Sequence, residues 1–102
     1  MRMSEEQKNE IKLELVRCLR EEPEITRLVV FGSFISSTEP NDLDLAIFQN
    51  SGDDYLSLAL KYRRRIRPVT RKIPIDVLPI RPNAPPVPFL REIEKGEVIY
   101  ER

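Results

Sequence analysis

The sequence contains no histidine and only one cysteine, Cys18. Without histidine, catalysis by a Ser-His or Cys-His pair is excluded, and so is any histidine-ligated metal site. A single cysteine can form neither an intrachain disulfide nor a thiolate zinc cluster. Because Cys18 lies at helical spacing with apolar residues, we expect a buried structural thiol.

Net charge is also absent, since Lys and Arg together number 17 and Asp and Glu together number 17. Overall charge therefore indicates neither a nucleic acid nor a membrane as the partner. No apolar run approaches the length that spans a membrane, and the N-terminal residues lack the apolar core of a signal peptide. We expect a cytoplasmic protein without a membrane anchor, with residues 1–102 forming one domain.

Apolar periodicity and chain-breaking residues predict seven elements in the order α-β-β-α-β-α-β. Pro74 and Pro79 lie in the third strand and cannot donate hydrogen bonds, so this strand is expected at an edge. The order predicts an α+β fold, a small mixed β-sheet with helices packed on it. The first predicted helix covers about residues 5–22, the second begins after its cap at Asp53 and is stopped by Pro68, and the third begins at Pro88 with its C-cap at Gly96. The predicted strands cover about residues 25–31, 43–48, 73–80 and 98–100.

Three aspartates interrupt these apolar strands. Asp42 and Asp44 are two residues apart, and alternation along a strand places both on one face while the leucines beside them enter the core. Asp76 stands alone in the third strand, where a charge is costly to bury unless it is paired or bound to a cation. If the two strands are neighbours, three carboxylates converge and offer the oxygen ligands that Mg²⁺ or Mn²⁺ prefers.

Each of these signals is weak by itself. Asp42 follows a proline and an asparagine and is compatible with a turn, and Asp44 can pair with an arginine. Many strands also end in a Gly-Ser pair such as Gly32-Ser33. The combination is more specific, because a strand ending in Gly-Ser is followed by a D-x-D on a second strand and by the solitary Asp76 on a third.

Three stretches together resemble the minimal nucleotidyltransferases of the DNA polymerase beta superfamily. They are residues 30–34 (VFGSF), 41–48 (NDLDLAIF) and 74–78 (PIDVL). The resemblance implies a polymerase beta palm-like fold. It also implies that Gly32 and Ser33 bind the triphosphate, and that Asp42, Asp44 and Asp76 hold two Mg²⁺ ions, with Mn²⁺ as the alternative. Residues 34–40 depart from the family pattern, because they contain neither its second glycine nor its arginine.

The same resemblance implies a reaction and a partner. Asp42, Asp44 and Asp76 would be catalytic in transferring a nucleoside monophosphate, AMP from ATP, to an acceptor hydroxyl by a two-metal mechanism. Many stand-alone members pair with a small helical protein of the HEPN ribonuclease class and act as its antitoxin. A non-catalytic antitoxin that acts by contact alone is the alternative, and the unusual residues 34–40 favour it.

A run of cations lies between residues 61 and 72. The interpretation we favour is a solvated helix end whose positive charges stabilise the helix dipole. The second interpretation is a surface for triphosphate, RNA or an acidic partner. Because aromatic residues are not interleaved with the cations in an ordered way, base stacking is not favoured. Tyr55, Tyr62 and Tyr100 are predicted to pack in the core rather than line a site.

Overall fold

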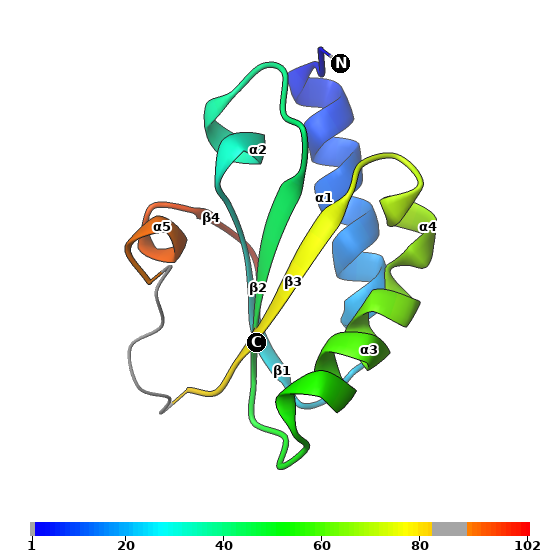
Figure 1. The fold of residues 1–102 in the computed structure, drawn as a ribbon, viewed down its shortest axis with the longest axis vertical. Coiled ribbons are helices and arrows are strands. Elements are labelled where there is room, and N and C mark those ends of the chain that lie inside the picture. Colours follow the sequence, from blue (N-terminus) through cyan, green and yellow to red (C-terminus); the bar gives the residue numbers. More distant parts are fainter. Residues whose placement is uncertain (1, 83–89) are drawn as a thin grey trace.

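The computed structural model describes residues 2–82 and 90–102. A helix precedes each strand along the chain, and two consecutive helices precede the third strand (Figure 1). The elements are α1 (Glu5–Leu19), β1 (Ile25–Phe31), α2 (Ser33–Ser36), β2 (Leu43–Gln49), α3 (Tyr55–Arg65), α4 (Arg67–Thr70), β3 (Ile75–Ile80), α5 (Leu90–Glu94) and β4 (Glu97–Glu101).

The strands form one mixed sheet in the order β3-β2-β1-β4. β1 pairs antiparallel with β2 and with β4, whereas β2 and β3 are parallel. Parallel neighbours need a long crossover, and α3 with α4 provides it. β3 lies at an edge of the sheet, as Pro74 and Pro79 predict. The predicted α+β fold with a mixed sheet is therefore confirmed.

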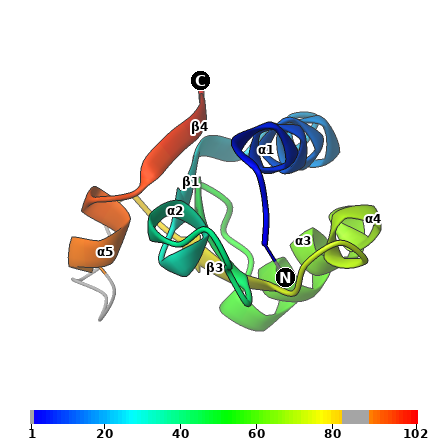
Figure 2. The same cartoon turned by 90° about the horizontal axis from the view of Figure 1, so that it is seen from above.

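Helices α1, α3 and α4 cover one face of the sheet, and α5 lies on the other (Figures 1 and 2). The larger core lies between the sheet and helices α1, α3 and α4, and it contains the fully buried Leu15 and Tyr62. The smaller core joins Ile93 of α5 to Phe31 and its neighbours on the second face. Asp44 alternates with buried leucines of the larger core, so it lies on this second face.

The start and end of α3 differ slightly from the prediction. Asp54, rather than Asp53, caps the helix, because its Oδ1 accepts a hydrogen bond from the N–H of Ser57 at 2.8 Å. A cap accepts from the N–H three residues further on, which sets the first helical residue at Tyr55. Pro68 lies in the first turn of α4, where its missing N–H costs no hydrogen bond.

Other boundaries shift by a few residues. α1 ends at Leu19 instead of near residue 22, and β3 begins at Ile75 instead of near residue 73. The four-residue helices α2 and α4 were not among the seven predicted elements. The last two elements match α5 and β4, although Pro88 lies outside the described residues.

Cys18 is half-buried rather than fully buried, and burial raises the pKa of its thiol. Its side chain packs against the rim of the larger core. No helix in the described ranges has both the length and the apolar character needed to cross a membrane.

Candidate functional site

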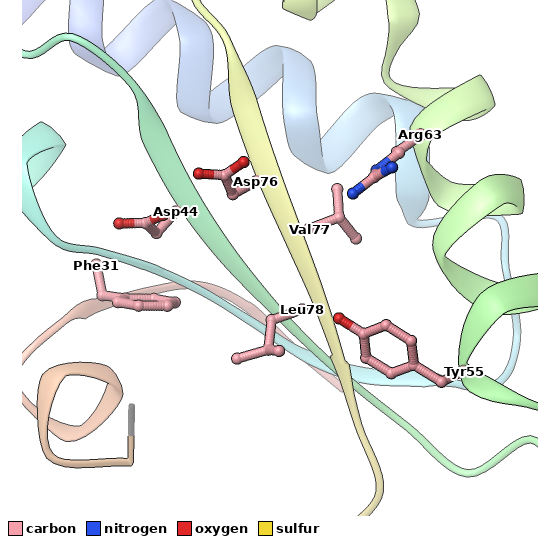
Figure 3. Close-up of a pocket in the computed structure, with 7 residues that line it drawn as sticks. All are labelled: Phe31, Asp44, Tyr55, Arg63, Asp76, Val77 and Leu78. Carbon is pink, nitrogen blue, oxygen red and sulfur yellow. The ribbon is translucent and has the colours of Figure 1, made fainter. Parts of the chain in front are cut away.

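Asp44 and Asp76 are paired in register on the parallel strands β2 and β3. Paired residues on neighbouring strands lie on the same face about 4.8 Å apart along the ladder, and Figure 3 shows both carboxyl groups pointing to the same side of the sheet. Asp42 comes just before β2, and alternation gives it the same face as Asp44. Leu43 between them is fully buried in the opposite direction. Asp44 and Asp76 thus share one face of two adjacent strands, and Asp42 lies close enough for its charge to act on Asp44.

The electrostatics of this cluster oppose full ionisation. Burial raises the pKa of Asp44, and the charges of Asp42 and Asp76 and a hydrogen bond with Asp76 raise it further. A divalent cation would relieve that repulsion, and carboxylate oxygens are ligands that Mg²⁺ prefers. In the part of the chain that the structure describes, no group of three acidic, cysteine or histidine side chains is arranged to hold a metal ion. Metal ligation by all three aspartates therefore remains a prediction from their chemistry.

Gly32 brings the end of β1 against this cluster. Its φ of 81° falls where only glycine is free of strain, and a Cβ added there would overlap the Asp44 carboxylate. Ser33 follows as the exposed first residue of α2. The predicted Gly32-Ser33 pair therefore lies directly beside the predicted carboxylates.

Lys8 positions the loop between α2 and β2 and was not predicted to do so. Its buried Nζ donates a hydrogen bond of 2.6 Å to the carbonyl of Ser37 and lies 5.5 Å from the centre of the Phe34 ring. The N–H of Met3 also donates to the carbonyl of Thr38 at 2.9 Å. Lys8 lies at helical spacing with the buried face of α1, and that spacing was the available signal.

A pocket of about 350 Å³ opens beside the paired aspartates (Figure 3). Its walls come from β1, β2, β3 and α3. The prediction that Tyr55 packs in the core is wrong, because its side chain is 55% exposed and lines this pocket with Arg63. Tyr62 is fully buried, as predicted. The lining residues are Phe31, Asp44, Tyr55, Arg63, Asp76, Val77 and Leu78.

The sequence did not identify Tyr55 and Arg63 as pocket residues. Helical periodicity shows which side of a helix is apolar, but not which other elements lie beside that helix. The pattern correctly places Leu58 and Tyr62 of α3 inside. It does not show that α3 runs beside the edge strand β3, which brings Tyr55 and Arg63 to the pocket.

Two cationic side chains of α3 form ion pairs with the segment that follows α1. Lys61 Nζ lies 2.9 Å from a carboxylate oxygen of Glu22 and 2.9 Å from one of Glu24. Arg65 pairs with Glu22 at 2.8 Å, and the hydroxyl of the buried Tyr62 donates to Glu24 at 2.8 Å. Part of the cationic run is therefore structural and lies on the side of α3 that contacts these glutamates.

Comparison with known families matches residues 13–102 to the family described as "Polymerase beta, Nucleotidyltransferase". No curated protein matches the chain. Among solved structures, a chain of the tri-AMPylated Shewanella oneidensis HEPN toxin in complex with MNT antitoxin is 15% identical, with 93% of this chain and 73% of that chain covered and a TM-score of 0.64.

Two further complexes contain similar chains. One is a toxin-antitoxin crystal structure with AMP-PNP, at 14% identity, 89% and 73% coverage and a TM-score of 0.70. The other is the toxin-antitoxin MntA-HepT, at 14% identity, 92% and 73% coverage and a TM-score of 0.61. At such low identity the likeness concerns the fold alone.

Proposed function

This chain belongs to the polymerase beta nucleotidyltransferase family, and on that premise we propose that it transfers AMP from ATP to an acceptor hydroxyl. The observation that carries the proposal is the in-register pair of Asp44 and Asp76 beside a pocket. Asp42 two residues earlier and Gly32 against the Asp44 carboxylate support it. A purely structural sheet would tolerate apolar residues at these strand positions.

In the proposed reaction, the acceptor oxygen attacks the α-phosphorus of the triphosphate. The bond from that phosphorus to its bridging oxygen breaks, and pyrophosphate leaves. Asp76 takes the proton of the attacking hydroxyl. The hydroxyl of Ser33 and the backbone beside Gly32 bind the departing pyrophosphate, because N–H groups in the first turn of a helix lack internal partners.

The aspartates would also bind the metal. Asp42, Asp44 and Asp76 would hold two divalent ions, Mg²⁺ or Mn²⁺. When bound, such ions neutralise the charge that develops on the attacking and leaving oxygens. We further propose that residues 1–102 form one minimal nucleotidyltransferase domain.

We propose that the acceptor belongs to a small helical HEPN-type protein and that this chain acts as its antitoxin. The solved complexes with the same fold support this, since one is described as a tri-AMPylated HEPN toxin with MNT antitoxin and another contains AMP-PNP. A second candidate is an antitoxin that acts by contact without transfer. Residues 34–40 favour it, because they lack the glycine and arginine that many family members carry there.

The test is transfer of label from α-labelled ATP with Mg²⁺ and the HEPN-type product of the adjacent gene. Asp44→Asn should lower transfer by at least about a hundredfold, as loss of a group that stabilises transition-state charge does. Asp53→Asn is the matched control, because this carboxylate is exposed and does not line the pocket. Full transfer by Asp44→Asn would refute its role. Wild-type chain that neutralises the partner without labelling it would establish the contact-only alternative.

A further inference from the structure

Three arginines near the end of α3 and the start of α4, Arg63, Arg64 and Arg67, have no ion pair with any other described residue. Lys61 and Arg65 of the same run are paired with glutamates. The three arginines are exposed, and stabilising the helix dipole needs no further partner. Arg63 also lines the carboxylate pocket.

A second pocket, also of about 350 Å³, lies between α3, α4 and the edge strand β3. Arg63 lines both pockets, so one surface leads from Asp44 and Asp76 to the unpaired arginines. The residues lining the second pocket are Leu60, Arg63, Arg64, Arg67, Thr70 and Ile75.

Two large apolar side chains of α3 extend this surface. Leu56 is 66% exposed and Leu60 is 50% exposed, and their spacing of four residues puts them on one face of the helix. Arg64, four residues after Leu60, continues that face. Exposed apolar residues that adjoin unpaired charges mark interaction sites more often than isolated ones do. We call the side chains of Leu56, Leu60, Arg63, Arg64 and Arg67 the α3 ridge.

We propose that the α3 ridge binds an acidic amphipathic helix of the partner protein, the helix that carries the acceptor hydroxyl. This proposal rests on the proposed function. Apolar residues of that helix would cover Leu56 and Leu60, and its carboxylates would pair with the arginines, whose planar groups suit carboxylates. Arg63 would then place the acceptor at the mouth of the carboxylate pocket. A nucleic acid would engage the arginines but leave both leucines exposed to water.

Another exposed apolar surface lies between α1 and β4, where Leu13 and Val98 are prominent. Its cation, Lys12, is already paired with Glu97 at 2.9 Å, so it offers no free charge to an acidic helix. β4 is also the strand at the edge of the sheet opposite β3. This surface is therefore remote from the carboxylates and provides a matched control.

The experiment measures the affinity of the full chain for the HEPN-type product of the adjacent gene by titration calorimetry, with label transfer from ATP in parallel. Leu56→Glu with Leu60→Glu, and separately Arg64→Glu with Arg67→Glu, should each weaken the complex at least about tenfold, as loss of interface anchors does. The arginine effect should shrink at high salt. None of these four residues lines the carboxylate pocket, so Mg²⁺–ATP affinity should stay within about twofold of wild type.

Controls separate this proposal from the proposed function. Leu13→Glu should bind the partner like wild type, and Asp44→Asn should form the complex but transfer nothing. If wild type binds through the ridge but transfers no label, the proposed function fails and the ridge stands. Ridge variants that bind like wild type, or a Leu13→Glu variant that does not bind, would overturn the ridge. RNA binding that the arginine variants lose and the leucine variants keep would also overturn it in favour of a nucleic acid. Melting curves confirm that each variant is folded.

Discussion

Gly32 lets the Asp44 carboxylate approach the end of β1, so replacing it with alanine tests how the site is built. The backbone at this residue has φ 81° and ψ −154°, a region almost confined to glycine. Holding another residue there costs about 1–3 kcal/mol. For a chain of this size each kcal/mol lowers the melting temperature by roughly 4–8 °C. Gly32→Ala should therefore melt lower by roughly 4–24 °C.

The substitution should also remove activity in the protein that stays folded. The new methyl group would overlap the Asp44 carboxylate, which must then move away from its position beside Asp76. The assay combines thermal unfolding by circular dichroism with label transfer from ATP at a temperature where the variant is folded. Transfer should fall at least about tenfold, since small displacements at a reacting centre have large effects on rate.

Gly52→Ala is the matched control, because a Cβ at that residue would meet no atom within 4 Å and its φ is not positive. Its stability should change by less than about 1 kcal/mol. The reasoning fails if Gly32→Ala melts and transfers like wild type. It also fails if Gly52→Ala loses as much stability as Gly32→Ala.

Three further predictions concern individual side chains. Burial opposes the ionised form of Glu24, but hydrogen bonds from Lys61 and Tyr62 stabilise that form more strongly. The pKa of Glu24 is therefore lowered. Its contribution to stability is therefore present at neutral pH and lost as pH falls through that lowered pKa. In Glu24→Gln, the free energy of unfolding should fall less steeply at acidic pH than in wild type, as measured by urea unfolding at a series of pH values. Asp76→Asn should lower the pKa of Asp44 toward its ordinary value of 3.8, as followed by carboxyl NMR in metal-free protein, and an unchanged pKa would contradict the described cluster. Lys8→Met should cost about 1.5–3 kcal/mol, because a hydrogen bond from a charged group is lost, and a wild-type melting curve would show that this contact is dispensable.

The strands of the sheet could be predicted from the sequence because the patterns that indicate them are local. Alternation around Asp42 and Asp44, and the prolines at Pro74 and Pro79, are signals that depend on residues close in the chain. The order of the strands in the sheet depends on contacts between residues far apart in the sequence. The prediction that Asp44 lies beside Asp76 therefore depended on a strand pairing that the sequence does not show. The parallel ladder between β2 and β3 resolves that condition.

Residues that act across long sequence separations escaped prediction. Lys8 bonds a carbonyl 29 residues away, and Tyr55 reaches a pocket formed largely by strands. A periodic pattern reports which side of a helix is apolar, but not which distant segments lie against that helix in the fold. The position of Asp54 as the cap was missed for a smaller reason, because two adjacent aspartates are equivalent until the first helical residue is known.

The helix that carries the α3 ridge is also the connection that brings β3 back alongside β2. Parallel strands cannot be joined by a tight turn, so this connection cannot be cut out without separating Asp76 from Asp44. Substitutions on the exposed surface of the helix leave this connection in place, so partner choice can be redesigned there without moving the two carboxyl groups.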